Sequence, residues 1–561
     1  MFWNKIKERA PEIFLLGATA FLQFFRLGLG EIQSWDEALY LIRSEACIKF
    51  GVWVDQTQYA ISGLYSSTHP PLVMWIMAFL RMLFGSGVFA SRIVSAIAAV
   101  TALYFFYKLL GRFFSRWTAL FTTISLGCAQ NFLLYGHHAQ LDIPLFAFIT
   151  SAAYFAVLGF EENNSKMMLI AGILYGGALL AKAVQGLYLL PFLFALPYIV
   201  HSYKGYKKIA LLLLTAVVVA TPWYIYMMVK HPEFSGDYAS LVGSMKAGTY
   251  AKEVATKWWY YLNQTIINFP AVILGLFAVI PLIMNRKKPS THYSRLSISV
   301  VVWLIVSIIF LSSFHTKMLH FSLFLLLPTS LLIGFFTEEY LQRAPKWSVI
   351  FISSVTLVLV ITWSASELIR KSIREQHLPQ LHYDFITIVI IVIIIAMLAF
   401  LFYKYISSSP QAFVLFIASL VLLSIEYYRW GSRNNETFVD GAEQSGLILL
   451  NSPNIRTLSV YHDDYPHESY LPQFNYYTNC WLMGWDPNRS GATRTWGEID
   501  SLIKINNIPK SDAAVLYVSW DAFYKPTEEE KARLMRIDQG LALRYLRSYH
   551  SKKYQLYWEP K

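Results

Sequence analysis

The sequence predicts an α-helical protein that crosses a membrane many times and carries a small α/β domain outside it. Of its 561 residues, 55% are hydrophobic and only 15% are charged. The mean hydropathy of +0.41 lies on the apolar side of the usual soluble composition. Apolar runs long enough to span a bilayer recur as far as Trp430, and beyond it polar turns alternate with short β-forming runs.

The formal net charge of +12 comes largely from short basic clusters between apolar runs, such as those at 204–208 and 286–288. Clusters in such connections set the orientation of the neighbouring spans. We therefore expect membrane lipids, and no nucleic acid, as partners of the basic residues.

Transmembrane helices need about twenty mostly apolar residues, because every backbone N–H and C=O must be satisfied within the segment. The first apolar run follows Lys5, Lys7 and Arg9 and has no small-residue cleavage site, so we expect it to remain as a span. The rule predicts thirteen spans, at residues 11–30, 88–110, 117–135, 142–160, 167–182, 186–202, 208–228, 267–285, 297–314, 320–336, 347–364, 384–404 and 411–428.

The distribution of lysine and arginine places the N-terminus inside. Predicted inner connections carry Arg112, Arg116, Lys166 and Lys404, as the positive-inside rule requires. The predicted outer loop at 370–374 is a basic exception.

These spans predict two domains, a transmembrane domain at 1–430 and an outer α/β domain at 431–561. The first domain includes a long outer loop at 31–87 and a second one at 229–266. Within the first loop, Ala38–Phe50 and Leu72–Phe84 are expected as amphipathic helices at the membrane surface.

The C-terminal region contains two predicted strands, Thr457–Tyr461 and Ala514–Val518, and a charged helix at Glu528–Arg536. The chain shows no internal repeat, which argues against an inverted-repeat transporter.

The aromatic residues of the C-terminal region either contact a glycan or form an ordinary small core, and we favour the core. They are Tyr476, Tyr477, Trp481 and Trp485.

The three cysteines, Cys47, Cys128 and Cys480, have no metal-binding or CxxC spacing. An odd number cannot all pair within one chain, so we expect free thiols. A bridge between Cys47 and Cys480 is the alternative.

The first outer loop holds the acid pair Asp36-Glu37 and, further on, His69 before Pro70-Pro71. The acids could cap the helix that starts there, or could carry catalysis. The histidine could be a solvated loop residue, or could be aimed at a substrate by the rigid prolines.

Further ionisable residues stand at predicted outer ends of spans. His138 and Asp142 have the i, i+4 spacing that places two side chains on one helical face, where they could pair or bind a metal ion. Lys182 and Lys317 could reach the membrane surface, or could hold a phosphate. Acids and cations on the same outer face are suited to a reaction between a membrane-anchored phosphate donor and a hydroxyl or amine acceptor.

Taken in order, these motifs resemble the GT-C class of polyprenyl-phosphate-dependent glycosyltransferases over about residues 11–340. The nearest relatives by pattern are the protein O-mannosyltransferases and the bacterial aminoarabinose lipid A transferases. The matching stretches are Asp36-Glu37, His69-Pro70-Pro71-Leu72, Leu141-Asp142, Lys182 and Lys317–Pro328. His-Pro-Pro matches the mannosyltransferases. Thr68 and His69 replace the Glu-Lys of the aminoarabinose transferases, so the metal site and phosphate lysine of those enzymes do not carry over.

The resemblance implies an inverting membrane glycosyltransferase that takes a monosaccharide from a polyprenyl-phosphate donor. The acceptor would be a lipid, glycan or protein at the outer face of a bacterial cytoplasmic membrane. It implies Asp36 and Asp142 as catalytic acids, and it leaves open whether a divalent metal takes part. The expected substrate-binding residues are Glu37, His69, His138, Lys182 and Lys317. A transporter or lipid-linked sugar flippase is the rival, and a polymerase or ligase acting on pyrophosphate-linked oligosaccharide is a third reading.

Overall fold

A computed structural model describes most of the chain, and its coordinates form two compact units. The helical unit contains Met1–Leu27 and Arg92–Ser432, and the mixed unit contains Gly28–Ser91 and Arg433–Lys561. The described residues are 8–33, 36–59, 68–200, 205–247, 257–269, 271–275, 292–338, 378–406, 410–431, 441–452, 457–462, 472–477, 513–518, 547–550 and 554–558.

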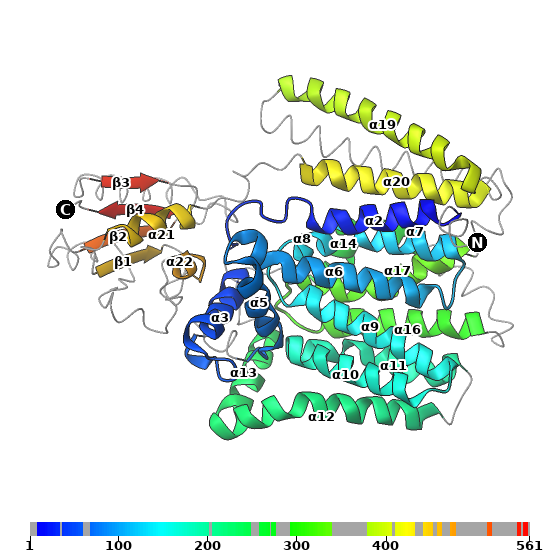
Figure 1. Ribbon diagram of the computed structural model, residues 1–561. Coiled ribbons are helices and arrows are strands. Elements are labelled where there is room, and N and C mark those ends of the chain that lie inside the picture. Colours follow the sequence, from blue (N-terminus) through cyan, green and yellow to red (C-terminus); the bar gives the residue numbers. More distant parts are fainter. Residues whose placement is uncertain are drawn as a thin grey trace. The chain divides into compact units, whose positions relative to one another are not determined.

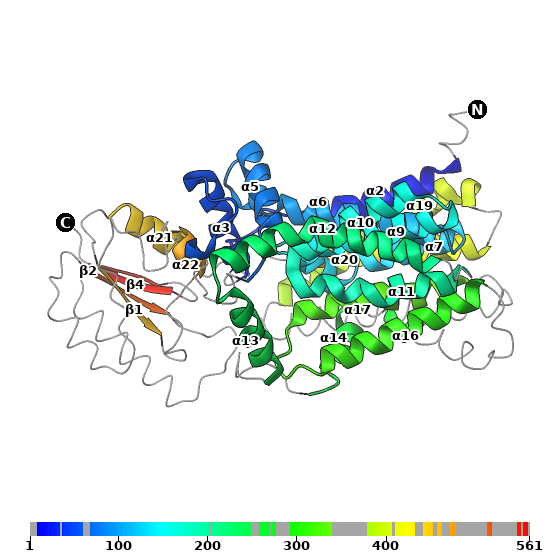
Figure 2. The same cartoon turned by 90° about the horizontal axis from the view of Figure 1, so that it is seen from below.

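Long helices of the helical unit run side by side along a common direction (Figures 1 and 2). Because their side chains are apolar almost all round, they are suited to bury against one another or against lipid. The helices are α2 (Ala10–Phe24), α6 (Val88–Leu110), α7 (Arg116–Gly127), α8 (Gln130–Gly136), α9 (Asp142–Glu161), α10 (Ser165–Lys182), α11 (Leu190–Ile199), α12 (Tyr206–Lys230), α13 (Phe234–Ala247), α14 (Tyr260–Asn268), α16 (His292–Ser312), α17 (Leu323–Phe336), α19 (Leu378–Ile406) and α20 (Pro410–Gly431). Two 3-10 turns, η2 (Ala183–Leu189) and η4 (Leu319–Ser322), precede α11 and α17.

The predicted class of helical membrane protein is confirmed. Among the described residues, seven helical segments are long and apolar enough to cross a membrane. They are Val88–Leu110, Asp142–Glu161, Ser165–Ile199, Tyr206–Lys230, Arg295–Ser312, Leu319–Phe336 and Pro410–Gly431. The predicted spans at 267–285 and 347–364 lie wholly or partly outside the described residues.

The predicted span at 117–135 is divided in the structure. Helix α7 ends at Gly127, and α8 begins at Gln130. A Cβ atom on Gly127 would lie 2.6 Å from the Thr19 methyl carbon, so only glycine fits where α2 passes. Gln23 Nε2 donates to the Gly127 carbonyl at 3.2 Å, which satisfies a backbone group left free by the helix end.

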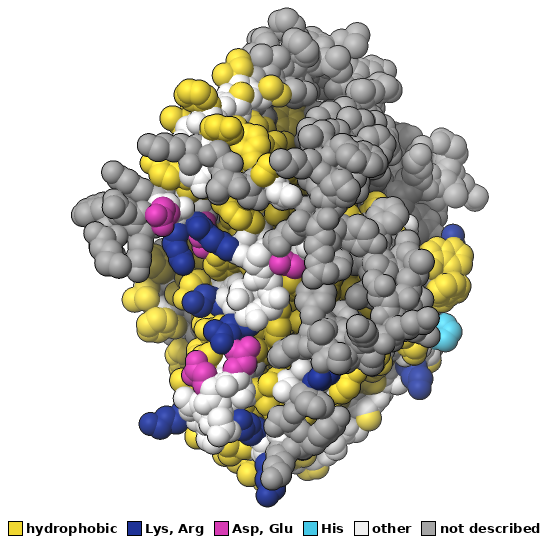
Figure 3. Space-filling view, turned by 90° about the vertical axis from the view of Figure 1, so that its right-hand side faces the viewer, with side chains coloured by type: hydrophobic (Ala, Val, Ile, Leu, Met, Phe, Trp, Pro, Cys, Tyr) yellow, Lys and Arg dark blue, Asp and Glu magenta, His cyan; other side chains and the backbone are white. Residues whose placement is uncertain are grey.

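One end of the helical unit gathers charged side chains (Figure 3). The connections α6–α7 and α9–α10 lie there, and Arg112 pairs with Glu161 while Arg116 pairs with Glu12. Lys166 follows Asn164, whose side chain caps α10 by accepting from the Lys166 N–H at 3.0 Å. This basic end matches the connections predicted to lie inside the cell.

The described residues of the mixed unit form five helical segments and a four-stranded sheet (Figure 1). The predicted strands near 457 and 514 are confirmed and pair in parallel, and the order in the sheet is β1-β2-β4-β3. The predicted helix at 528–536 lies outside the described residues. The elements are α3 (Asp36–Phe50), η1 (Thr57–Tyr59), α5 (Leu72–Phe84), α21 (Ala442–Leu450), α22 (Pro472–Tyr477), β1 (Thr457–His462), β2 (Ala513–Val518), β3 (Arg547–His550) and β4 (Tyr554–Trp558).

Helix α3 is not the amphipathic surface helix that the sequence suggested. Every residue from Glu37 to Cys47 is buried, because α5 and α22 pack against α3. Helix α5 does have an exposed apolar face, formed by Phe79, Met82, Leu83 and Phe84. Its placement at a membrane surface stays a prediction.

The first outer loop packs with the C-terminal region, whereas we had assigned it to the transmembrane domain. The buried Glu31 carboxylate caps α21 by accepting from the N–H groups of Gly441, Ala442 and Glu443 at 3.1, 3.3 and 3.2 Å. Gly441 has a φ of +93°, a conformation that favours glycine. These contacts span about four hundred residues of sequence, which is why a boundary drawn from composition missed them.

We expect replacement of Glu31 by Gln to destabilise the mixed unit by about 1–2 kcal/mol, because the N-terminus of α21 loses a charged cap. Amide hydrogen exchange of residues 442–450 measures this loss directly. Glu443→Gln is the matched control, since Glu443 is an exposed acid in the first turn of the same helix. Equal protection in both variants would contradict the capping role.

Candidate active site

The candidate residues fall in both units. Asp36, Glu37 and His69 belong to the mixed unit, and the other four belong to the helical unit. The latter four are His138, Asp142, Lys182 and Lys317.

Asp142 and Lys182 form a buried ion pair at the end of the helical unit opposite the basic end. Helix α9 begins at Asp142, and the antiparallel α10 ends at Lys182 after a short connection. Lys182 Nζ lies 2.9 Å from Oδ1 and 2.8 Å from Oδ2 of Asp142. Each side chain is only 1% exposed, so the two charges compensate each other in a low-dielectric environment.

The backbone changes direction at Lys182, which fixes where its side chain points. Lys182 leaves the helical conformation, and Ala183 adopts a φ of +45°, which is uncommon for a residue with a side chain. The η2 turn follows immediately. Phe321 from η4 covers the ammonium group, with its ring centroid 5.9 Å from Nζ.

His320 is a buried residue of this region that we missed from the sequence. It lies in η4, is 6% exposed, and its ring is close enough to feel the charges of Asp142 and Lys182. Its Nε2 has no hydrogen-bond partner within the part of the chain that the structure describes. A single histidine in an apolar run is usually a core residue, so its residue type and position did not single it out.

Lys317 is a second buried cation at the same end, with a different environment. Its Nζ donates to the Ser312 carbonyl at 3.2 Å and to the Phe314 carbonyl, and it lies 5.7 Å from the Tyr261 ring centroid. The residue is 1% exposed, and burial lowers the pKa of its ammonium group. Among the described residues no carboxylate lies within ion-pair distance of Lys317, so its charge is solvated by carbonyls and an aromatic face rather than neutralised.

The prediction that His138 and Asp142 share a helical face is wrong. Helix α8 ends at Gly136 and α9 begins only at Asp142, so His138 lies in the connection and the i, i+4 spacing does not apply. His138 is half-buried. Its neighbour His137 stacks on Trp430 with ring centroids 4.1 Å apart, and both of its ring nitrogens contact backbone carbonyls.

In the mixed unit, Asp36 and Glu37 have different surroundings. Asp36 is the first residue of α3 and is half-buried. Glu37 is fully buried, and its Oε2 accepts from the Gln33 N–H at 2.7 Å, which fixes the chain that enters α3. Glu37 therefore binds the chain before the helix rather than an N–H group of α3, and Asp36 is the more accessible acid.

His69 is buried rather than solvated, so the reading of a solvent-exposed loop histidine is wrong. Only 7% of the residue is exposed, and its ring lies 5.8 Å from that of Tyr40 on α3. Arg43 Nη2 donates to the His69 carbonyl at 2.9 Å, and its Nε donates to Gln56 Oε1 at 3.0 Å. Burial lowers the pKa of Arg43 to about 10.

The cysteines of the described residues are free, as expected. Burial raises the pKa of Cys47 to about 11, so its thiol is unreactive at neutral pH. Cys480 lies outside the described residues. Within the described ranges, no three His, Cys, Asp or Glu side chains are grouped so that they could hold a metal ion.

Comparison with known sequences gives one family match and several relatives. Residues 68–226 match a sequence model of the family described as dolichyl-phosphate-mannose-protein mannosyltransferase. The undecaprenyl phosphate-α-4-amino-4-deoxy-L-arabinose arabinosyl transferase of Pseudomonas savastanoi is 24% identical over 335 residues, which cover 58% of this chain and 61% of that protein. The Proteus mirabilis arabinosyl transferase 1 of the same kind is 25% identical over 319 residues, which cover 55% of this chain and 56% of that protein. The match thus spans about three fifths of the length of these curated relatives.

Comparison with solved structures gives a match along nearly the whole chain. The crystal structure of ArnT from Cupriavidus metallidurans bound to undecaprenyl phosphate has a TM-score of 0.65 and 17% identity, and covers 97% of each chain. The same protein in the apo state has a TM-score of 0.66 and 16% identity. The resemblance predicted from the sequence is therefore confirmed, and the chain has the GT-C fold.

Proposed function

We propose that this chain is an integral membrane glycosyltransferase that moves a monosaccharide from a polyprenyl-phosphate donor to an acceptor. The reaction takes place at the outer face of a bacterial cytoplasmic membrane. The observation that carries this proposal is Lys317, a buried ammonium group that no described carboxylate neutralises. A phosphate group would supply the missing negative charge. The matched ArnT structure contains such a lipid phosphate.

The chemistry is a single displacement with inversion at the anomeric carbon. An acceptor oxygen or nitrogen forms a bond to the sugar C1 while the bond from C1 to the phosphate oxygen breaks. The acceptor proton passes to the Asp36 carboxylate, and polyprenyl phosphate leaves with the electron pair. Because phosphate is already a good leaving group, the site needs a cation on the departing oxygen rather than a strong acid.

Lys317 is a better candidate for the donor phosphate than Lys182. The charge of Lys182 is balanced by Asp142, so a second anion would have to displace a buried carboxylate. We therefore assign Asp142 and Lys182 to shaping the donor site through their ion pair, and Lys317 to the leaving phosphate. His138 stays a candidate substrate contact, whereas the Glu37 carboxylate and the His69 carbonyl make structural hydrogen bonds within the mixed unit.

The acceptor could be a lipid, a glycan or a protein. The relatives named above are arabinosyl transferases, while the matched family model describes protein mannosyltransferases.

The alternative function, a transporter, fits the positions of the ionisable residues less well. Transport pathways carry ionisable groups near the middle of the membrane, whereas Asp142 and Lys182 stand at the first and last residues of their helices.

We expect Asp36→Asn to abolish transfer, by about 100-fold or more, because the acceptor proton loses its base. The assay is release of free polyprenyl phosphate from defined polyprenyl-phosphate sugars by the purified protein. Asp55→Asn serves as the control, since Asp55 is another acid of the same unit and accepts hydrogen bonds from the N–H and hydroxyl of Thr57. Transfer at the wild-type rate in Asp36→Asn would exclude the catalytic role.

We expect loss of either partner of the buried ion pair to destabilise the helical unit by about 3–5 kcal/mol, because an uncompensated buried charge remains. Asp142→Asn and Lys182→Met should each lower the thermal unfolding midpoint in detergent, and the double variant should recover most of the loss. If Lys182→Met left the midpoint unchanged and only raised the donor KM, Lys182 would be a phosphate ligand instead.

We expect Lys317→Met to weaken donor binding by about tenfold through loss of a charge-assisted contact. Burial lowers the pKa of Lys317, so in the wild type the cation is lost, and donor affinity falls, at a lower pH than for an ordinary lysine. Lys317→Arg keeps its charge and should move this fall to higher pH. Donor titrations between neutral and alkaline pH test both points, and identical pH profiles for wild type and arginine variant would rule out Lys317.

A further inference from the structure

Tyr476 belongs to the aromatic group for which the sequence left two roles open. It lies on α22, where both it and Tyr477 make hydrogen bonds inside the mixed unit. Tyr477 accepts from the Ile32 N–H at 2.8 Å. These contacts give the two tyrosines a structural place next to α3 rather than an open glycan-binding surface. Trp481 and Trp485 lie outside the described residues.

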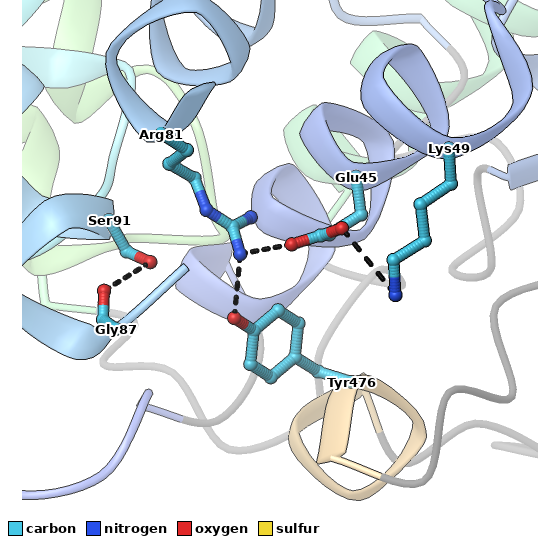
Figure 4. Close-up of polar contacts among 6 residues, drawn as sticks. All are labelled: Glu45, Lys49, Arg81, Gly87, Ser91 and Tyr476. Atoms are coloured by element: carbon cyan, nitrogen blue, oxygen red, sulfur yellow. Dashed lines mark hydrogen bonds and ion pairs between the residues drawn. The ribbon is translucent and has the colours of Figure 1, made fainter. Parts of the chain in front are cut away.

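Tyr476 contacts a buried guanidinium that joins three helices (Figure 4). Arg81 of α5 is 1% exposed, and its Nη2 donates to Tyr476 at 3.0 Å and also pairs with Glu45 of α3. Glu45 in turn lies 3.7 Å from Lys49, one helical turn further along. The Nε and Nη1 groups of Arg81 have no hydrogen-bond partner among the described residues. Within the described residues its hydrogen bonds therefore go through Nη2, to Glu45 and Tyr476, and the Tyr476 ring also lies 5.8 Å from the guanidinium carbon.

Burial raises the pKa of the Tyr476 phenol, which favours its neutral form. Its oxygen accepts from Arg81 at 3.0 Å. Among the described residues, loss of the hydroxyl would leave Glu45 as the hydrogen-bond partner of Arg81, with the aromatic ring of residue 476 still beside the guanidinium.

Helix α3 connects this network to Asp36. Glu45 lies nine residues after Asp36 on the same helix, at a distance of about 14 Å along its axis. The helix packs between α5 and α22, and its interior is buried on all sides. Because a helix of this length moves as a rigid rod, a change of its position at Glu45 is passed on to Asp36.

We propose that Tyr476 is a positioning residue for the transfer reaction, which fixes α3 through Arg81 and Glu45 and thereby sets the orientation of the Asp36 carboxylate. The proposal rests on the proposed function of Asp36. It gives the C-terminal region a part in catalysis without any contact with substrate.

The kinetic test compares Tyr476→Phe with Tyr549→Phe. We expect Tyr476→Phe to lower kcat about tenfold and to leave the donor KM within about twofold, because only the alignment of the base changes. Glu45→Gln should lower kcat similarly, and the double variant should be no worse than the worse single variant. Tyr549 lies on β3, the last strand in the order of the described sheet, so its Phe variant should match the wild type. An unchanged kcat in Tyr476→Phe, or a loss confined to KM, overturns the proposal.

Hydrogen exchange of α3 tests the anchoring without any assay of transfer. Amides of residues 39–47 should exchange about tenfold faster in Tyr476→Phe than in wild type, with the thermal midpoint nearly unchanged. Unchanged exchange overturns the anchoring. If exchange rises but the wild-type protein releases no polyprenyl phosphate from any donor, the anchor stands as a structural element and the proposed function fails.

Discussion

The structure depends on the rule that a charge removed from water must find a counter-charge or dense hydrogen bonding. Asp142 and Lys182 satisfy it by pairing at the junction of α9 and α10. This pair fixes the relative position of two helices and of the η2 turn that follows them. Within the described part of the chain, Lys317 satisfies the same rule with carbonyls and an aromatic ring, and we propose that its positive charge binds an anionic ligand.

In the mixed unit, buried charged side chains are likewise satisfied by hydrogen bonds, and these join parts of the chain that are distant in sequence. Glu31 caps α21, Arg81 links α5 to α3 and α22, and Arg43 holds the carbonyl of His69. These buried polar contacts specify a single packing of the first outer loop on the C-terminal region. Asp36 therefore stands on a helix whose position is determined by residues more than four hundred positions away.

Several features of the fold were predictable from the sequence because they are local. Apolar length identified the spans that became α6, α9, α10, α12 and α20, and alternating β-forming residues identified β1 and β2. The break between α7 and α8 was not predictable, because the residues that surround Gly127, Thr19 and Gln23 of α2, are distant from it in sequence. The burial of α3 was missed for the same reason, since its partner α22 is distant in sequence.

The sequence by itself determined the class of protein, the identity of the ionisable residues at one end of the spans, and their order along the chain. Hydropathy and charge depend on residue type alone, so no folded structure is needed to read them. Only the tertiary structure decided which charges are compensated. It paired Lys182 with Asp142, left Lys317 without a described carboxylate, and brought the unpredicted His320 next to the pair. Pairing depends on distances between helices, and these are set by packing over the whole unit.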